Sequence, residues 1–586
     1  MSLVMGENFM TRKKSIALIG LGPHAKRIYL NYLKKHKVEL GLLVDLDSKR
    51  EEARKYLNEN GFKNTKIFTI SDEYKDNKHL PSQIAQSLLD ICKTLEITHI
   101  IISTEPKAHN MYLEFALKNN IDVLTDKPIT VNKNMTSIKS INEISKQYYE
   151  IVELANNSKA MCNVMCQRQY HRGYEYIKQL LNEIVKKYQV PITYIDIYHC
   201  DGNWEMPHDL LKENHPYKYG YGKLFHSGYH FIDLLSDLIK INNQLPNTKK
   251  IKNGKVYSSC FTPNDEMAVF NIEDFKRIFK EQEIPEYYNQ NKNPKFNKFG
   301  EKNYYGQFTF KNANNQTITT ANLNLLHYGF SRRGWIESKD FYKSNGRIRH
   351  ERINIQVGAL LNIQVHSYQS KEIKDRLDIS YEEQIGGLEH FDIDIYRNID
   401  IIGGKPFERI KLGNLYTEKE KKNILGYNEL SREEYLTHFL KGKCSKGDIR
   451  DQALAIEILR SCSLGIHNYY KNKDQTEKIN IGNKNIYPIK ISMLKEFSAI
   501  DNKNKKKKAI DHYSIIGNDA EYGVMLNHLR SKNDYEVYLY VESDEIASHL
   551  LYKEIHSKMF AKLYFYYLRK IASKTDIIKI SKKLGI

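Results

Sequence analysis

Short apolar runs alternate with longer amphipathic stretches in the first part of the chain. The apolar runs lie at 15–20, 40–45, 99–103 and 122–125, and their length and composition predict buried strands. The amphipathic stretches lie at 25–35, 48–58, 82–95 and 107–119, and they predict helices. Short buried strands separated by helices are typical of a parallel sheet that is covered on both faces. This pattern therefore predicts an α/β domain with a doubly wound parallel sheet over residues 1–132.

Beyond residue 132 the pattern changes to strand-like alternation. In the segment 304–326, Phe308 and Phe310 alternate with Gln307 and Thr309, and 192–199 and 345–412 show similar alternation. Residues 449–470 predict a long helix. We therefore expect an α+β domain with a mostly antiparallel open sheet over 133–475. A segment rich in Asn, Lys and Pro near 240–303 predicts a surface insertion within it.

Residues 476–586 predict a small C-terminal extension of unknown role. Lysines at 505–508 indicate an exposed linker, and the alternation through Tyr535, Val537 and Leu539 predicts a strand. Residues 558–574 predict a helix with an apolar stripe and a basic opposite face. Such a stripe fits packing on a neighbouring element, and a membrane surface is the alternative.

Length and composition restrict the class of protein. A chain of 586 residues is too long for one hydrophobic core, and 41% hydrophobic residues exclude global disorder. The seven cysteines are scattered without the second close pair that a zinc set needs, so we expect reduced thiols and no metal. The apolar run 16–21 is too short for a secretory signal, and no run approaches the ~20 residues of a membrane span. We therefore expect a cytoplasmic protein without a membrane span.

The formal net charge of +19 raises the question of a nucleic-acid partner. The lysines are spread along the whole chain, and no nucleic-acid-binding motif accompanies them. We therefore expect no nucleic-acid partner. A positive field does favour anionic ligands such as nucleotides or sugar nucleotides.

The first predicted strand and helix meet at Gly20-Leu21-Gly22-Pro23-His24-Ala25, which has the Gly-x-Gly-x-x-Gly/Ala pattern. The first glycine permits a tight turn, the second lets the backbone approach a pyrophosphate, and the small Ala25 permits close helix–strand packing. Asp45 ends the second predicted strand, where a carboxylate accepts ribose hydroxyls. This combination predicts a Rossmann NAD(P)-binding domain with a cofactor site at these positions. A carboxylate at Asp45 favours NAD, while Lys49 and Arg50 keep NADP possible.

Two further motifs lie downstream. The first comprises Ser103-Thr104-Glu105-Pro106, His109 and then Thr125-Asp126-Lys127-Pro128. The second runs from Gly220 through His226, Gly228 and His230 to Asp233. Together with the glycine turn, these motifs resemble those of the Gfo/Idh/MocA oxidoreductases, the glucose–fructose oxidoreductase and inositol dehydrogenase family. The resemblance runs from about residue 14 to 240 and more weakly to about 473.

The resemblance implies roles for particular residues. By its Glu-Lys-Pro motif, Lys127 is the catalytic lysine and Asp126 contacts the nicotinamide ribose. By its Asp-x-Gly-x-His-x-x-Asp pattern, His230 is the catalytic histidine and His226 stands where an aspartate is usual. Further cofactor contacts fall on Thr104, Glu105, Pro106, His109 and Lys127. Substrate contacts fall on Lys127, His226, His230 and Arg168, with Trp204 and His208 as weaker candidates.

Oxidation of a secondary alcohol suits these residue types. A hydride leaves carbon while a proton leaves oxygen, so the protein must supply a base and stabilise the developing alkoxide. A lysine does both if its pKa is lowered by burial or nearby cations. His226 departs from the family pattern because a histidine is not a permanent negative partner for Lys127. Tyr221 also replaces a glycine that is usual in the family.

We therefore expect an NAD(P)-dependent oxidoreductase of carbohydrate metabolism that acts on a sugar, cyclitol or sugar nucleotide. The resemblance also implies a homo-oligomer through the sheet of the second domain. Two alternatives stay open: an NAD-dependent glycoside hydrolase that uses transient C3 oxidation, and a non-catalytic NAD-binding sensor or scaffold.

Overall fold

The computed structural model describes most of the chain up to residue 480. The described residues are 15–205, 210, 216–279, 294–329, 331–333, 349–369, 391–417, 420, 427–471, 473 and 475–480, and four strands after residue 484. The chain divides into two compact units, Met1–Asn480 and Ile481–Ile586.

A six-stranded parallel sheet opens the first unit. Its strands are β1 (Ser15–Ile19), β2 (Glu39–Leu46), β3 (Lys66–Ile70), β4 (Ile97–Ile102), β5 (Asp122–Thr125) and β6 (Cys162–Val164). Their order is β3-β2-β1-β4-β5-β6, so the chain changes direction across the sheet between β1 and β4. All five residues of β1 are buried, as a central strand covered on both faces requires. The predicted doubly wound α/β fold is confirmed, and its switch point lies beside the glycine turn.

The helices of this domain follow the predicted stretches closely. They are α1 (Pro23–Ala25), continued by a π-helical turn (Lys26–Leu30) and α2 (Asn31–Lys35), then α3 (Arg50–Glu59), α4 (Ser82–Thr94), α5 (His109–Lys118) and α6 (Ile138–Asn157). The sequence pattern did not predict β3 or β6. Only the last residue of β3 is fully buried, so the strand lacks an apolar run, and β6 has just three residues.

A ten-stranded sheet forms the second domain of this unit. It contains β7 (Ile192–Glu205), β8 (Asn253–Phe261), β9 (Asn303–Lys311), β10 (Thr317–Tyr328), β11 (Ser331–Arg333), β12 (Arg349–Val357), β13 (Leu361–Gln369), β14 (Phe391–Arg397), β15 (Phe407–Lys411) and β16 (Thr476–Asn480). The order is β15-β14-β13-β12-β7-β10-β9-β8-β16, with β11 paired to β7. β7 pairs in parallel with β10 and β11, and the other pairs are antiparallel. This arrangement confirms the mostly antiparallel sheet.

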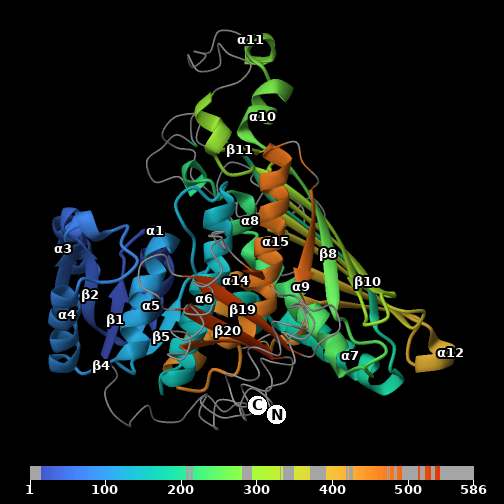
Figure 1. The fold of residues 1–586 in the computed structure, drawn as a ribbon, viewed down its shortest axis with the longest axis horizontal. Helices are drawn as coiled ribbons and strands as arrows, with labels where there is room; N and C mark the ends of the chain where they lie inside the picture. The colour runs from blue at the N-terminus through green and yellow to red at the C-terminus, as the bar shows by residue number, and fades with distance from the viewer. Residues whose placement is uncertain are drawn as a thin grey trace, which may run out of the picture. The chain divides into compact units, whose positions relative to one another are not determined.

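Helices cover one face of the second sheet. They include α7 (Arg172–Tyr188), α8 (Lys223–His226), α9 (Tyr229–Ile241) and α15 (Ala453–Tyr470). Figure 1 shows α6 and α15 between the blue parallel sheet and the green and yellow strands, and α15 contacts both α6 and β8. On β7, Ile195 and Ile197 are fully buried, whereas Tyr194 and Tyr198 on the opposite face are partly exposed. The sheet therefore has one covered and one open face.

The predicted domain boundaries at 132 and 475 stay predictions. Three features of the structure lie near these boundaries or within the predicted insertion. The parallel sheet extends to β6, and β16 pairs with β8. The span 240–303 contains β8, a member of the second sheet, besides α10 (Pro263–Val269) and α11 (Ile272–Phe279).

A helix from late in the chain packs on the parallel-sheet domain. α14 (Tyr427–Leu440) contributes Tyr435, Leu436 and Phe439 to the hydrophobic core that also contains Leu30 and Leu33. Tyr32 and Thr437 share a hydrogen bond of 2.9 Å between their hydroxyl oxygens. The parallel-sheet domain thus packs against residues from much later in the chain, since Tyr32 and Thr437 are 405 positions apart.

The second unit contains β17 (Asn485–Lys490), β18 (Tyr513–Ser514), β19 (Tyr522–His528) and β20 (Tyr535–Val541). They form an antiparallel sheet in the order β17-β20-β19-β18, and β20 is the strand that the alternation predicted. The lysines at 505–508 and the predicted helix at 558–574 lie outside the described residues.

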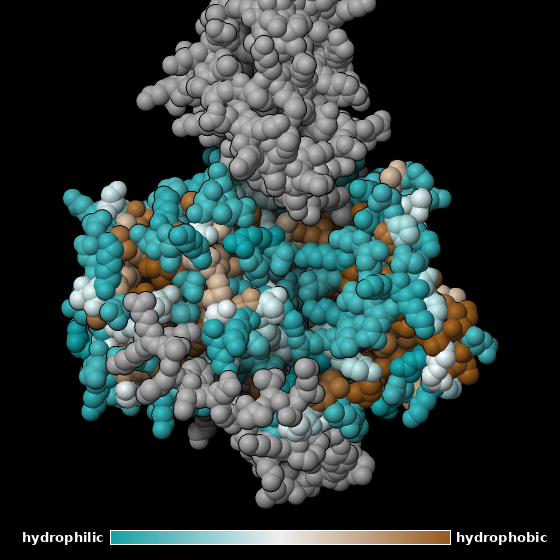
Figure 2. All heavy atoms as spheres, turned by 90° about the horizontal axis from the view of Figure 1, so that it is seen from below, coloured by the Kyte–Doolittle hydropathy of each residue, from teal (hydrophilic) through white to brown (hydrophobic). Residues whose placement is uncertain are grey.

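All seven cysteines are free. Among the described helices, none has the length and apolar character that crossing a membrane requires. The face in Figure 2 is mostly hydrophilic with smaller hydrophobic areas. Exposed apolar side chains include Ile399 and Ile401 of α12 (Ile399–Ile402) and Phe407.

Candidate active site

The glycine turn leaves room for a dinucleotide. Gly20 has a φ of +88°, and a Cβ there would lie 2.7 Å from the carbonyl oxygen of Ser103. Gly22 precedes α1, and a Cβ there would meet no described atom within 4 Å. Among the described residues, no side chain caps α1, and Pro23 at its first position has no N–H that would need a partner. These features fit a pyrophosphate bound at a helix start.

Asp45 holds the turn from the end of β2. Its carboxylate accepts hydrogen bonds from the backbone N–H groups of Leu21, at 2.9 Å, and Leu46, at 2.8 Å. Burial raises the pKa of Asp45, while these two hydrogen bonds oppose the rise. The structure thus places Asp45 beside the turn, where the sequence analysis expects it to meet the ribose.

His109 joins the two predicted cofactor segments from within the core. It is fully buried, with Nδ1 3.0 Å from the carbonyl oxygen of Pro128 and Nε2 3.2 Å from that of Thr104. Burial lowers its pKa. Glu105, in the same segment, is exposed and accepts a 3.0 Å hydrogen bond from the Tyr221 hydroxyl. His109 therefore ties the backbones of both segments together, and its direct contact with the cofactor stays a prediction.

Asp126 is held from three elements. Ser103 Oγ donates to its Oδ2 at 2.7 Å, the Tyr29 hydroxyl donates to its Oδ1, and His24 Nε2 lies 3.6 Å from Oδ1. Burial lowers the pKa of His24 to about 4, so this histidine is neutral at pH 7. Sequence reasoning missed Tyr29, since nothing local distinguishes it among 42 tyrosines.

Lys127 bridges the two domains of the first unit. It follows β5, and its Nζ donates to the backbone carbonyl of His226 at the end of α8. Burial lowers the pKa of Lys127 to about 8; Asp126 and Asp201 oppose this lowering, and Arg432 adds to it. A lysine with this pKa changes its protonation state near neutral pH, as a proton-transfer group requires.

The two histidines of the predicted pair contribute in different ways. The side chain of His226 is exposed, and this residue meets Lys127 through its main chain. His230 in the first turn of α9 is 8% exposed, and its buried Nδ1 has no hydrogen-bond partner among the described residues. Burial holds the pKa of His230 well below its usual range, and Lys127 adds to this effect. His230 is therefore neutral and keeps a ring nitrogen available.

Asp233, which closes the second motif, is engaged within the protein. Gln169 Nε2 donates to both of its carboxylate oxygens, at 2.9 and 3.0 Å, and Gln452 Nε2 donates at 2.9 Å. Burial raises its pKa to about 6. Asp233 thus anchors α9, the helix that carries His230.

Arg168 forms a buried ion pair. Its guanidinium donates to Glu351 at 3.0 and 2.6 Å and lies 4.2 Å from the centre of the Phe231 ring. The Tyr174 hydroxyl donates to the same carboxylate at 2.8 Å. These contacts position Arg168 within the protein, and its predicted contact with substrate stays a prediction.

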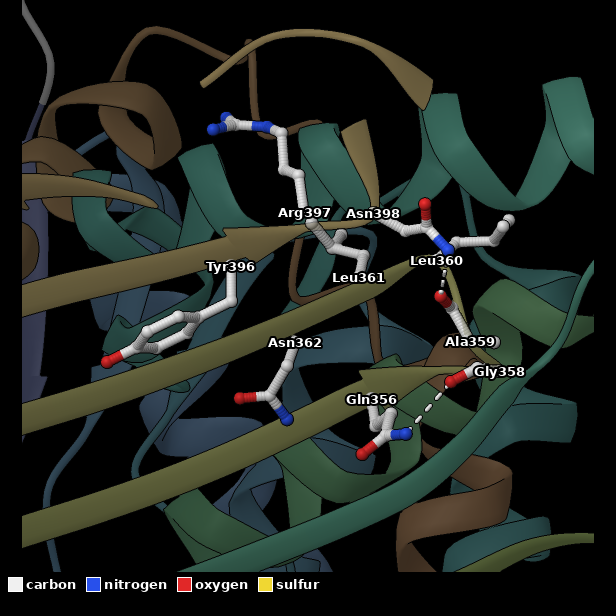
Figure 3. Close-up of a pocket in the computed structure, with 9 residues that line it drawn as sticks. All are labelled: Gln356, Gly358, Ala359, Leu360, Leu361, Asn362, Tyr396, Arg397 and Asn398. Carbon is white, nitrogen blue, oxygen red and sulfur yellow. Dashed lines mark hydrogen bonds between the residues drawn. The ribbon is translucent and has the colours of Figure 1, made fainter. Parts of the chain in front are cut away.

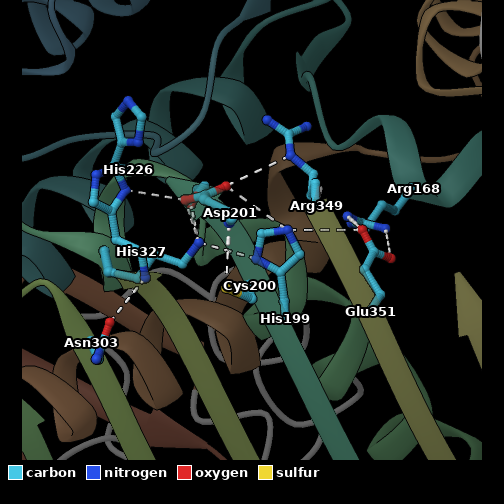
Figure 4. A network of polar contacts seen from close by, with 12 residues as sticks. Arg168, His199, Cys200, Asp201, His226, Asn303, His327, Arg349 and Glu351 are labelled. Atoms are coloured by element: carbon cyan, nitrogen blue, oxygen red, sulfur yellow. Dashed lines mark hydrogen bonds and ion pairs between the residues drawn. The ribbon is translucent and has the colours of Figure 1, made fainter. Parts of the chain in front are cut away.

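A charged cluster that the sequence analysis did not find lies below α8. Lys223 Nζ, fully buried, donates to Asp201 at 2.6 Å and to Ser227 at 2.7 Å. His327 Nδ1 lies 3.3 Å and Arg349 Nε 3.8 Å from Asp201, as Figure 4 shows. The available signals were weak: the predicted strand 192–199 ends two residues before Asp201, and Lys223 lies within the second motif without a predicted role.

The remaining candidates lie elsewhere. Trp204 belongs to β7, and nothing further is described of its side chain; His208 lies outside the described residues. Arg432 on α14 was not predicted, because nothing in the sequence connects it with the motifs 200 residues earlier. In the part of the chain that the structure describes, no group of three or more His, Cys, Asp or Glu is arranged to hold a metal.

A small hollow lies at the other end of β12. Its lining includes Gln356, Asn362, Tyr396 and Arg397 (Figure 3). Its lining residue Gln356 lies five positions along β12 from Glu351, which corresponds to about 17 Å. The hollow is therefore separate from the Arg168–Glu351 ion pair.

The N-terminal part of the chain matches a known protein family. Residues 14–156 match the Gfo/Idh/MocA family model, described as an oxidoreductase family with an NAD-binding Rossmann fold. No curated protein matches the chain.

Solved structures are similar to the chain over most of their length. An oxidoreductase domain protein from Kribbella flavida is 14% identical, with 80% of this chain and 100% of that chain covered and a TM-score of 0.47. The WlbA dehydrogenase from Bordetella pertussis in complex with NADH and UDP-GlcNAcA is 13% identical, with 81% and 99% covered and a TM-score of 0.44. A myo-inositol dehydrogenase from Corynebacterium glutamicum ATCC 13032 is 13% identical, with 80% and 100% covered and a TM-score of 0.42. Similarity at this level of sequence identity does not show which substrate the chain binds.

Proposed function

Since residues 14–156 belong to the NAD-binding Rossmann domain family of the Gfo/Idh/MocA oxidoreductases, we propose that this chain transfers a hydride between NAD and a secondary alcohol or ketone. The substrate we propose is a sugar, a cyclitol or a sugar nucleotide. The observation that supports this most directly is Lys127. It follows β5 at the cofactor side of the sheet, is hydrogen-bonded across to α8, and has a pKa lowered to about 8.

The chain's own residues supply the proton chemistry. Bound NAD supplies the hydride acceptor or donor. In the oxidation direction, neutral Lys127 accepts the proton of the substrate hydroxyl at its Nζ. The ammonium that forms stabilises the negative charge that develops on the substrate oxygen. His230 orients the hydroxyl through its ring nitrogen, and Asp126, held by Ser103 and Tyr29, positions the neighbouring cofactor ribose. The Gly20–Gly22 turn and Asp45 bind the pyrophosphate and adenine-side ribose.

Assembly and cofactor choice are further parts of the proposal. The open face of the ten-stranded sheet is the surface through which we expect copies of the chain to associate. NAD is the cofactor we expect to be preferred over NADP, because Asp45 repels a 2′-phosphate.

The reaction should depend on pH in opposite ways in its two directions. Alcohol oxidation needs unprotonated Lys127, so kcat/KM should rise about tenfold per pH unit at low pH and level off above about 8, the pKa of Lys127. Ketone reduction needs the ammonium form, so its rate should fall above the same pH. Initial rates between pH 5.5 and 10, from NADH absorbance, measure both profiles. Parallel profiles in the two directions would contradict Lys127 as the acid–base group.

A substrate panel tests the proposed activity. The full chain is incubated with NAD⁺ and individual sugars, cyclitols, sugar nucleotides and glycosides, while NADH absorbance and thermal melting are followed. A substrate should raise the melting temperature by mass action and generate NADH in proportion to ketone formed. Sugar released from a glycoside without net NADH would instead assign redox-assisted hydrolysis. Tight NADH binding with no turnover across the panel would support a sensor or scaffold.

A further inference from the structure

The carboxylate that the family pattern places on α8 is absent from this chain. Position 226 is a histidine, and α8 (Lys223–His226) contains no acidic residue. The exposed His226 ring turns away from Asp201 in Figure 4, while the backbone carbonyl of His226 accepts the Lys127 hydrogen bond. Lys127 therefore receives a dipole, and no negative charge, from α8.

A different carboxylate lies directly below this helix. Asp201 on β7 is buried, and it accepts hydrogen bonds from Lys223 Nζ at 2.6 Å and Ser227 Oγ at 3.1 Å. Lys223 begins α8 and Ser227 directly follows His226, so these contacts hold the helix at both ends. Asp201 thus fixes the backbone segment that accepts the Lys127 hydrogen bond.

Asp201 is ionised in this cluster. Burial alone would raise its pKa, but Lys223 and His327 outweigh burial and hold the pKa well below its usual range. His199, whose Nδ1 lies 3.0 Å from Lys223 Nζ, is neutral because burial holds its pKa far below the usual value. Arg349 adds a second cation 3.8 Å from Asp201. Asp201 therefore carries a permanent negative charge among cations.

Charged and titratable groups of several neighbouring elements act on the pKa of Lys127. Positive or neutral groups are Arg432 of α14, His230 of α9 and His24 of α1, and potential negative groups are Asp126 after β5, Cys166 after β6 and Asp201 of β7. Burial raises the pKa of the Cys166 thiol far above neutrality, so it is uncharged. Asp126 and Asp201 are thus the two anions that face Lys127 in this set.

We propose that Asp201 positions Lys127: by holding both ends of α8 it fixes the His226 carbonyl that accepts the Lys127 hydrogen bond, in a chain that has no carboxylate on α8 itself. Asp201 is a positioning residue, since it acts on Lys127 through α8. The inference rests on the proposed role of Lys127 as the proton-transfer group.

The protonation of Lys127 can be measured without any substrate. The full chain, without NAD, is labelled with acetic anhydride at a series of pH values, and mass spectrometry follows acetylation of the Lys127 peptide. The wild-type midpoint should lie near 8. Asp201→Asn should lower it by about one pH unit, because α8 is released and the charged form of Lys127 loses its hydrogen bond to the His226 carbonyl. Asp196→Asn is the matched control, because Asp196 lies on the same strand with its side chain on the open face.

Two further variants keep the result decisive. Asp201→Asn alone leaves Lys223 buried without its carboxylate, so Asp201→Asn/Lys223→Met removes both charges if the single variant does not fold. This double variant should also have a lowered midpoint. Adding His226→Asp to Asp201→Asn should restore the midpoint towards the wild-type value, because it returns a carboxylate to α8. An unchanged midpoint in a folded Asp201 variant would overturn the proposal. This measurement uses neither substrate nor turnover, so its outcome is independent of the substrate panel that tests the proposed function.

Discussion

Replacing Lys127 with methionine is expected to reduce turnover by about 10²–10⁴-fold, the range for loss of a positioned acid–base group. Methionine keeps most of the side-chain length but neither takes a proton nor balances charge on a substrate oxygen. Lys127 donates to the His226 carbonyl, and the glycine turn and Asp45, which we expect to bind NAD, are separate from it in sequence. NADH affinity should therefore change little.

Two measurements separate catalysis from binding in this variant. Fluorescence titration gives the NADH Kd, and single-turnover kinetics gives the hydride-transfer rate. Lys139→Met is the matched control, because Lys139 is an exposed lysine on α6. Normal turnover in Lys127→Met would remove this residue from the chemistry.

Replacing Arg168 with methionine is expected to lower the free energy of unfolding by about 3–5 kcal/mol, because one partner of a buried ion pair is removed. Glu351 is 2% exposed, and it would lose both of its hydrogen bonds from Arg168. The Tyr174 hydroxyl would remain its donor, at 2.8 Å, which does not balance a buried charge.

Urea denaturation measures this loss, and a second substitution identifies its cause. Arg168→Met/Glu351→Gln should recover part of the stability, since the uncompensated charge is then gone. Arg277→Met is the control: Arg277 is 71% exposed in its pair with Asp274, and exposed pairs contribute about 0–1 kcal/mol. A stable Arg168→Met variant with weakened substrate binding would instead support the substrate contact expected from the sequence.

The sequence by itself determined the first domain and its cofactor turn. A glycine with φ of +88°, a small residue at position 25 and a carboxylate ending the second strand are local requirements, so a contiguous motif encodes them. Buried apolar runs likewise predicted β1, β2, β4 and β5, because central parallel strands are apolar throughout. Strands β3 and β6, at the two edges of the sheet, lacked such a run.

The tertiary structure decided how the charges around Lys127 are arranged. The motif placed Lys127 and His230, but only the packing of α8 showed that His226 contributes its carbonyl. Asp201 and Arg432 lie on β7 and α14, and sheet register and helix packing bring them to Lys127. Ion pairs between distant segments depend on which side chains share a buried face, and a single sequence does not record that pairing. Local backbone geometry could thus be predicted from the chain, whereas the electrostatic surroundings of Lys127 follow from its folding.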